Sequence, residues 1–342
     1  MTSRVRTKLG EAWFSLAWRL RPAVGRPRIG LRDLLRLLYP NPLPEDLHRE
    51  QTAYRVVGSN TVRSLGAVRD ILATLDAHSA PSPVSVRLGP DDVVETEVGG
   101  VRLALDRADH SVASVMLADH AYEPHVTRVL TELLAPGMTF LDVGANVGYF
   151  TVLAGRLVGP GGRVVAVEPS SENCRLLLRS LDLNDLHNVT LLPLALAEVT
   201  GWSYLVPHVG SNSSLESTTA GPADLGRWGQ VVPTVRGDAV VTERVDVVKM
   251  DVEGAEGLVV AGLAPVIERW RPVVVSEASE EMLARVSGRS LAEFLGWFAD
   301  RGYRCAVIDE DGSEPCDVDD LDAFVAGWGD RFRIENLLLR PR

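Results

Sequence analysis

From residue 139 onward, short runs of β-branched apolar residues alternate with longer segments whose apolar positions recur at helical spacing. Runs that are apolar on both sides are typical of strands buried between two layers of helices, so this region predicts a doubly wound, mostly parallel α/β sheet. The expected strands are residues 140–143, 163–167, 189–196, 245–251, 272–277, 303–309 and 333–339, and the clearest helices are residues 172–183 and 291–301.

A different pattern precedes this region. Residues 93–98 and 101–105 alternate apolar and polar positions on either side of Gly99 and Gly100. Two alternating runs around a Gly-Gly turn indicate a β-hairpin. We expect this hairpin to cover one edge of the main sheet.

Residues 1–80 predict a mainly helical extension that prolines interrupt. Apolar residues recur at helical spacing at Leu9, Trp13, Leu16 and Leu20. Residues 1–36 also carry nine basic against two acidic side chains. A basic amphipathic helix of this kind either binds an anionic membrane surface or an acidic partner, or packs on the acidic body of its own chain. The expected organisation is the extension (1–80), the hairpin with its lead-in (81–121) and the main domain (122–342).

The formal net charge of −11 over 342 residues narrows the possible partners. It disfavours nucleic acid, because phosphate contacts need clustered lysines and arginines. The three cysteines, Cys174, Cys305 and Cys316, lack the spacing of a metal site and leave an odd thiol, which favours a reducing cytoplasm. No apolar run reaches the length of a membrane span, so we expect a soluble protein without a transmembrane segment.

The strand at residues 140–143 runs into a glycine-rich turn that contains Gly144 and Gly148. Glycines let the backbone turn tightly and approach a ligand at the carboxyl end of a strand, where open α/β sheets bind their ligands. Glu168 ends the next strand, about twenty residues after the turn. An acidic side chain in this position accepts hydrogen bonds from the two hydroxyls of an adenosine ribose.

Two kinds of adenosine ligand fit this pattern, a dinucleotide and S-adenosylmethionine. Dinucleotide sites place further glycines so that a pyrophosphate lies on the helix amino terminus, whereas here Asn146 stands at the second position. Asp142 precedes the turn and no basic residue is near, which favours a ligand with a cationic amino-acid end. A methyl donor therefore ranks above a nicotinamide cofactor.

Charged residues also gather where the strand at 245–251 ends. Side chains alternate along a strand, so Lys249 and Asp251 point to the same side, and Glu253 joins them if the chain stays extended. These groups are either catalytic or structural. In the structural alternative Lys249 and Asp251 form an ion pair, while Glu253 and Glu256 stabilise the positive end of the following helix. Two acids with a substrate diol would also suit Mg²⁺, but no third protein ligand is evident and no metal is assigned.

Three blocks of this sequence resemble the signature blocks of the FkbM family of S-adenosylmethionine-dependent methyltransferases. They are FLDVGANVGYF at 140–150, VAVEP at 165–169 and VKMDVEGAE at 248–256. The resemblance extends over about residues 115–342 and includes residues 122–124 and 213–215. Residues 235–240 depart from the Thr-Leu-Asp-rich stretch common in relatives, and residues 1–80 have no recognised counterpart.

The resemblance implies a class I methyltransferase fold, which is Rossmann-like with a seven-stranded sheet. It also implies O-methylation of a hydroxyl on a sugar or polyketide-like natural product, in secondary metabolite biosynthesis. We expect Glu168 to hold the donor's ribose and Glu198 to lie by the adenine, near residues 195–198. The residues expected at its methionine end are Asp142, Gly144, Asn146 and Gly148.

Methyl transfer to a hydroxyl needs an aligned acceptor and a group that removes its proton. The candidates for this general base are Asp251, Glu253, Lys249 if burial lowers its pKa, and His208 or His125 on loops. Two other functions compete with the O-methyltransferase. One is a non-catalytic ligand-binding or scaffold module of the same fold. The other is a nicotinamide-dependent oxidoreductase, which would need a third glycine that the turn lacks.

Overall fold

The computed structural model describes residues 87–88, 93–107, 109, 112–207, 213–216, 230–329 and 332–342. The predicted helical extension at 1–80 and the candidate base His208 lie outside these residues. Within the described ranges, no helix is both long enough and apolar enough to cross a bilayer.

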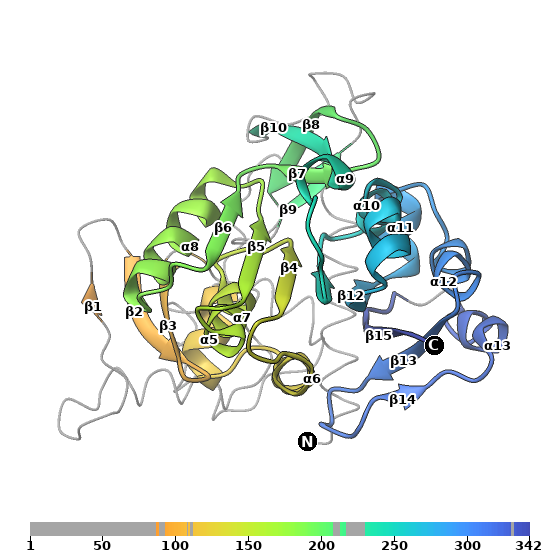
Figure 1. Cartoon of the computed structure of the whole chain (residues 1–342), viewed down its shortest axis with the longest axis horizontal. Helices are drawn as coiled ribbons and strands as arrows, with labels where there is room; N and C mark the ends of the chain where they lie inside the picture. The colour runs from red at the N-terminus through yellow and green to blue at the C-terminus, as the bar shows by residue number, and fades with distance from the viewer. Residues whose placement is uncertain are drawn as a thin grey trace, which may run out of the picture.

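The main sheet of the described chain has eight strands in the order β14-β13-β15-β12-β11-β4-β5-β6 (Figure 1). The strands are β4 (Thr139–Val143), β5 (Arg163–Val167), β6 (Val189–Leu192), β11 (Val247–Met250), β12 (Val273–Ala278), β13 (Tyr303–Ile308), β14 (Cys316–Asp317) and β15 (Glu335–Pro341). Strands β12, β11, β4, β5 and β6 pair in parallel, whereas β15, β13 and β14 pair antiparallel. The class I α/β fold is confirmed, each predicted strand region contributes a strand to this sheet, and the two-residue β14 is added at one edge.

Side chains on the central strands alternate between two hydrophobic cores. In β4, Phe140 packs into one core and Leu141 into the other, and in β11 Val247 and Val248 divide in the same way. Helices therefore cover both faces, which explains the apolar character of both sides of these strands. The helices are α5 (Val112–Asp119), α6 (Pro124–Leu133), α7 (Tyr149–Val158), α8 (Ser171–Leu183), α9 (Gly237–Val240), α10 (Glu256–Trp270), α11 (Glu280–Val286), α12 (Leu291–Ala299) and α13 (Leu321–Ala326).

Side-chain caps fix the starts of two helices that the sequence pattern predicts. The hydroxyl of Ser170 accepts a hydrogen bond from the Asn173 backbone at the start of α8. Ser290 and Glu293 form a reciprocal capping box at the start of α12. Such caps satisfy backbone N–H groups that a helix cannot pair internally.

The predicted hairpin forms, but it lies on a helix and does not cover an edge of the main sheet. Strands β1 (Arg87–Leu88), β2 (Val93–Val98) and β3 (Val101–Asp106) make a separate antiparallel sheet. The backbone N–H of Ala104 donates to the Ser180 hydroxyl on α8 at 3.0 Å, and Arg179 pairs with Glu95 at 2.6 Å. Because the apolar face of β3 is buried in the core shared with α7 and α8, the edge placement is wrong.

The single strand expected at residues 189–196 is also wrong. The chain leaves β6 at Leu192 and re-forms as β7 (Ala195–Ala197) in a second sheet, with Pro193 between them. Pro193 lacks an N–H for a ladder and directly follows the last residue of β6, which is the edge strand of the main sheet. The second sheet has the order β7-β10-β8-β9, with β8 (Gly201–Pro207), β9 (Ser213–Glu216) and β10 (Gln230–Arg236).

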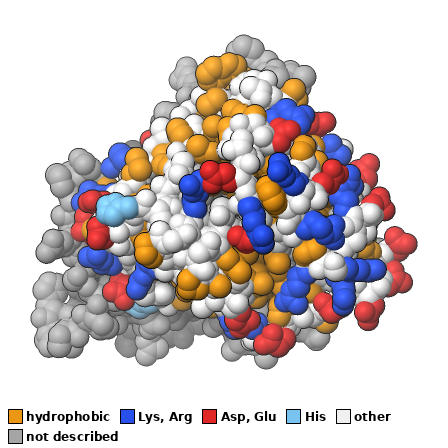
Figure 2. Space-filling view, viewed as in Figure 1, with side chains coloured by type: hydrophobic (Ala, Val, Ile, Leu, Met, Phe, Trp, Pro, Cys, Tyr) orange, Lys and Arg blue, Asp and Glu red, His pale blue; other side chains and the backbone are white. Residues whose placement is uncertain are grey.

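The second sheet exposes apolar side chains. Val199 is 70%, Trp202 66% and Val231 55% exposed. Figure 2 shows hydrophobic side chains gathered at the top of the molecule, where Figure 1 places this sheet, while basic and acidic side chains intermingle over the rest of the visible face.

Candidate active site

The glycine turn joins β4 to α7 and contacts the ends of both neighbouring strands. Gly144 and Asn146 have positive φ angles of 83° and 52°. The backbone N–H of Gly144 donates to the Val167 carbonyl at the end of β5, at 3.0 Å. A Cβ on Gly144 would lie 1.9 Å from the carbonyl oxygen of Asp251, at the end of β11. Glycine is required here because the ends of β4 and β11 are in direct contact.

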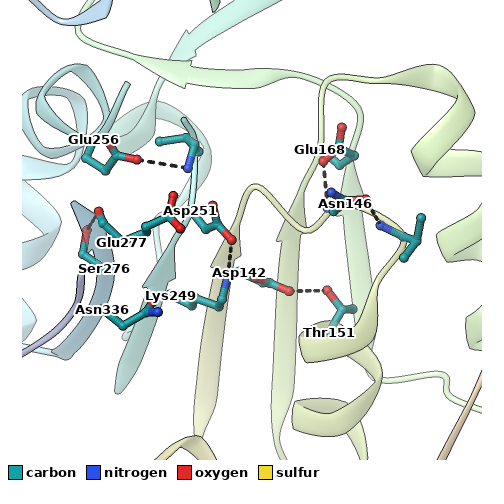
Figure 3. Close-up of polar contacts among 12 residues, drawn as sticks. Asp142, Asn146, Thr151, Glu168, Lys249, Asp251, Glu256, Ser276, Glu277 and Asn336 are labelled. Carbon is teal, nitrogen blue, oxygen red and sulfur yellow. Dashed lines mark hydrogen bonds and ion pairs between the residues drawn. The ribbon is translucent and has the colours of Figure 1, made fainter. Parts of the chain in front are cut away.

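Glu168 follows β5 and bonds to the same turn. It is 4% exposed, and its Oε2 accepts a hydrogen bond from the Asn146 backbone at 2.8 Å (Figure 3). Its Oε1 accepts from the Ser170 backbone at 2.8 Å. Burial raises the pKa of Glu168 to about 7, although the hydrogen bonds from Ser170 and Asn146 oppose the rise. The predicted juxtaposition of turn and acid is therefore a direct contact in the structure.

Asp142 lies at the carboxyl end of β4 and is 1% exposed. Its Oδ2 accepts a hydrogen bond from the Thr151 hydroxyl at 2.6 Å, as Figure 3 shows. Its other oxygen, Oδ1, is buried without a hydrogen-bond partner among the described residues. Burial raises the pKa of Asp142, and the charge of Lys249 opposes that rise. A buried, unpaired acceptor is costly unless a donor occupies it, which fits a ligand with a cationic or N–H group.

Lys249 and Asp251 lie on the same side of the chain, as strand alternation predicts. The Lys249 ammonium is 3.0 Å from Oδ2 of Asp251 and 4.6 Å from the ring centre of Phe150. Burial by itself lowers the pKa of Lys249, but the charges of Asp251, Glu123 and Asp142 outweigh it and raise the pKa above its usual value. The condition under which Lys249 would act as a base, a pKa lowered by burial, is therefore not met.

Glu253 does not extend the strand as expected. Its φ of 55° turns the backbone out of the extended conformation. Even so, its carboxylate lies among acids: burial, Asp251 and Glu256 raise its pKa to about 8. Oε1 of Glu256 accepts hydrogen bonds from the backbones of Val252 and Gly254, at 3.1 Å and 3.3 Å. Glu256 thus closes the loop before α10, in agreement with its predicted place at the helix start.

Two acidic residues of the site, Glu277 and Glu123, are not among the site residues predicted from the sequence. Glu277 lies near the carboxyl end of β12, and burial together with Asp251 and Glu253 raises its pKa well above the ordinary value. Glu123 precedes α6 with a φ of 39°, and burial raises its pKa to about 7. A signal existed for each: Glu277 closes a strand as Glu168 does, and Glu123 lies in one of the family-like segments.

A small pocket lies beside the turn. Its walls come from α5, the turn, the start of α7 and the end of β11. The lining residues that bear on the chemistry are Met116, Tyr122, Asn146, Phe150, Lys249 and Asp251. The pocket therefore brings the Lys249–Asp251 pair together with apolar and aromatic side chains.

Among the expected site residues that do not line this pocket, Glu198 and His125 make contacts elsewhere. Glu198 is exposed after β7 and pairs with Arg289 at 3.5 Å. His125 is buried on α6 with its Nε2 3.1 Å from the Asn336 amide nitrogen, and burial lowers its pKa. In the described part of the chain, no group of three or more His, Cys, Asp or Glu side chains is placed to hold a metal ion.

Comparison with known proteins gives one family match. Residues 142–305 match the model of the methyltransferase FkbM domain. The match begins at Asp142 and includes Glu168, the Lys249–Asp251 pair and Glu277, so it covers the carboxyl ends of β5, β11 and β12.

Two curated relatives are similar over short stretches, and both are named protein-L-isoaspartate O-methyltransferase. The protein from Methanopyrus kandleri is 47% identical over 47 residues, which is 13% of this chain and 21% of the relative. That from Methanothrix thermoacetophila is 34% identical over 71 residues, 20% of this chain and 34% of the relative. The aligned stretches thus span about a fifth and a third of these relatives.

A crystal structure of a methyltransferase FkbM from Methylobacillus flagellatus KT is also similar. It is 14% identical with a TM-score of 0.38, over 67% of this chain and 55% of that one.

Proposed function

We propose that this chain, whose residues 142–305 belong to the FkbM methyltransferase family, is an S-adenosylmethionine-dependent O-methyltransferase. Its acceptor is a hydroxyl on a sugar or a polyketide-like natural product of secondary metabolism. The names of both curated relatives favour an oxygen acceptor. Bound S-adenosylmethionine would supply a methyl group on a sulfonium, which is open to in-line attack.

One observation carries this proposal: the carboxyl ends of three adjacent parallel strands meet. The Asn146 backbone bonds to Glu168 after β5, and the Asp251 backbone after β11 donates to the Val143 carbonyl of β4 at 3.0 Å. The glycine turn, the acid after β5 and the charged end of β11 thus form one surface. In open α/β sheets this edge binds the ligand.

The turn and its acids suit a cationic, adenosine-containing donor. In this proposal Asp142, Gly144, Asn146 and Gly148 hold its amino-acid end, and the unpaired Oδ1 of Asp142 offers that end an acceptor. Glu168 accepts from ribose hydroxyls in addition to its backbone donors. Glu198, which is exposed after β7 and paired with Arg289, contacts the adenine in this proposal.

The end of β11 provides the chemistry on the acceptor side. Lys249 stays protonated and fixes the orientation of Asp251 through their 3.0 Å contact. Asp251 and Glu253 then act on the acceptor hydroxyl, by hydrogen bonding to it or by taking its proton. His208 remains a candidate from the sequence alone, because it lies outside the described residues.

Calorimetry and methyl transfer test the proposal on the full chain. S-adenosylmethionine and S-adenosylhomocysteine should bind at micromolar concentration, and NAD should not. Methyl-tritiated donor should label compounds from a panel of hydroxylated glycosides and polyketide-like alcohols, without labelling their O-methylated forms. Asp142→Asn should abolish donor binding, while Asp319→Asn, an exposed acid near the sheet edge, should not. Tighter binding of NAD, or labelling of nitrogen acceptors alone, would contradict the proposal.

A further inference from the structure

Two apolar residues of α5 line the pocket together with the Lys249–Asp251 pair. They are Val112 and Met116, which are 4% and 1% exposed. Residues four apart on a helix lie on the same face, so these two side chains form one surface, the α5 wall. This wall lies outside the family-matched residues 142–305, which supply the glycine turn and the charged pair.

Contacts at both ends hold α5 in place. At its start the Asp109 carboxylate accepts a hydrogen bond from the Ala113 backbone at 3.3 Å. Just after its end the His120 carbonyl accepts a hydrogen bond from the Gly99 backbone in the hairpin turn, at 3.0 Å. The α5 wall also belongs to the hydrophobic core that contains the apolar face of β3. It is therefore a fixed surface of the pocket.

The aromatic side chains of the pocket add a second apolar surface. The ring centres of Tyr122, Tyr149 and Phe150 lie 5.1–5.8 Å apart. The Tyr149 hydroxyl forms a hydrogen bond with the Thr127 hydroxyl at 3.2 Å. A hydrogen bond also joins the Tyr122 hydroxyl to the Glu123 carboxylate. Because both tyrosine hydroxyls have partners in the protein, the rings present mainly carbon to the pocket.

Apart from the tyrosines, the polar side chains that line the pocket come from other elements than α5. They are Asn146 in the glycine turn, and Lys249 and Asp251 at the end of β11. A ligand hydroxyl beside these groups can hydrogen-bond to them. The side chains of the α5 wall offer carbon atoms and one thioether sulfur, which is a weak acceptor and no donor. A second hydroxyl buried against this wall would lose its hydration without gaining a partner, which costs free energy.

We propose that the α5 wall selects the acceptor: it packs against apolar carbon atoms next to the hydroxyl-bearing carbon, while that hydroxyl points toward Lys249 and Asp251. The inference rests on the proposed function and narrows its acceptor. The substrate is an alcohol with an alkyl neighbour on at least one side of the reacting hydroxyl. A sugar ring whose neighbouring hydroxyls are all free is a poor substrate.

The test uses the full chain and the hydroxyl compound that the tritiated donor labels. Two congeners of this compound are compared, which carry either a methyl or a hydroxyl group on a carbon next to the reacting position, and they are made at each neighbouring carbon. Labelling at the original position is measured. At the carbon that faces the α5 wall, kcat/KM of the wild type should be about 10-fold or more higher for the methyl congener, because the hydroxyl is buried without a partner.

Variants of the wall should change this preference. Val112→Thr places a hydroxyl on the wall with little change in shape and should reduce the preference at least about 5-fold, since the second hydroxyl gains a partner. Met116→Gln should act in the same way, whereas Met116→Leu stays apolar and should keep the preference. Val115→Thr is the matched control, because Val115 lies on α5 but is not among the residues that line the pocket.

Donor binding separates the wall from the donor site. The affinity for S-adenosylhomocysteine, measured by calorimetry, should change less than about 3-fold in all of these variants. Circular dichroism checks that each variant is folded, and Met116→Gln carries the test if Val112→Thr is not.

Equal kcat/KM values for the two congeners at every neighbouring carbon would overturn the role of the α5 wall. A preference that Val112→Thr leaves unchanged would do the same. So would a donor affinity that falls more than about 10-fold in Val112→Thr but not in Val115→Thr, because the wall would then belong to the donor site. These results would leave the methyltransferase in place. A wild-type chain that labels no hydroxyl compound would instead contradict the proposed function, and this assignment with it.

Discussion

The ammonium group of Lys249 lies 3.0 Å from a carboxylate oxygen of Asp251, and both side chains come from the end of one buried strand. The Lys249 side chain is 4% exposed and that of Asp251 23%. Around this pair stand Glu123, Asp142, Glu253 and Glu277. The Lys249 ammonium is therefore a buried positive charge among acidic side chains.

Replacing Lys249 by methionine tests how much the buried pair stabilises the fold. The change keeps most of the side-chain volume but leaves Asp251 and its neighbouring acids without the cation. Loss of one partner from a buried pair costs about 3–5 kcal/mol, measured as the free energy of unfolding in urea. Arg244→Met is the control, since Arg244 is 70% exposed in its pair with Asp246, and exposed pairs contribute about 0–1 kcal/mol. Equal effects in the two variants would contradict the buried role.

Gly144 in the turn after β4 and Gly137 before β4 form a matched pair of glycines. Gly144 and Gly137 have similar φ angles of 83° and 87°, but a Cβ meets the Asp251 carbonyl oxygen at 1.9 Å in the first and nothing within 4 Å in the second. Gly137→Ala should cost about 1–2 kcal/mol, the conformational penalty alone. Gly144→Ala should cost several kcal/mol more or yield little folded protein, as judged by urea denaturation and circular dichroism. Similar stabilities would show that the strand ends can separate.

The buried acids predict how stability depends on pH. Burial raises the pKa from the ordinary 4.5 to about 7 in Glu123, Glu168 and Glu256, and to about 8 in Glu253. Between pH 4.5 and these values the native state holds protons that the unfolded chain has released, so this contribution is complete below pH 4.5 and is lost as pH rises through 7–8. The slope is about 1.4 kcal/mol per pH unit for each such proton.

Unfolding midpoints in urea, measured from pH 5.5 to 8.5, test whether the free energy of unfolding falls as the pH rises. Glu253→Gln should flatten the fall that extends toward pH 8, whereas Glu132→Gln at an exposed position should leave the profile unchanged. A free energy of unfolding that increases across the whole range would refute the raised pKa values.

Glu168→Ala should weaken binding of S-adenosylhomocysteine about 10- to 100-fold. The variant removes the acceptor for the ribose and frees the Asn146 backbone N–H, and hydrogen bonds to charged groups contribute about 1.5–3 kcal/mol. Calorimetry provides the affinities, with Glu172→Ala, in the first turn of α8 and exposed, as the control. Unchanged affinity would remove Glu168 from the ribose site.

Asp251→Asn should lower turnover, because Asp251 lines the pocket and is proposed to act on the acceptor hydroxyl. Donor affinity should change less than about 3-fold if Asp251 acts mainly on the acceptor. Turnover at saturating donor and calorimetry of the two proteins separate these effects, and an unchanged turnover would remove Asp251 from the acceptor side.

Local pattern predicts the central sheet well. The strand at 163–167 has the same bounds in the structure, because a run of valines is bounded by Gly162 before it and Pro169 after it. The predictions that failed concern tertiary contacts between elements. The hairpin was predicted as such, but which surface it covers depends on the shape of α8, and the departure of β7 depends on Pro193 and on β10, which lies far along the chain.

From the sequence, site residues could be placed next to each other only where they lie on the same strand. Strand alternation places Lys249 beside Asp251, because both residues share one element. It does not anticipate Glu253, whose φ of 55° reverses the chain. Glu123 and Glu277 reach the cluster from a helix start and from another strand, and no local pattern encodes that distance.

The hairpin turn reaches into the wall of the pocket, since a Cβ on Gly99 would lie 2.4 Å from the Tyr149 hydroxyl oxygen. Arg156 on α7 donates to the Gly100 carbonyl beside it. A shortened chain that starts at the family-matched boundary would lose this support and would bare the surface of α8 to water. Trimmed versions for crystallisation or enzymology therefore have to retain the sequence from Arg87 onward.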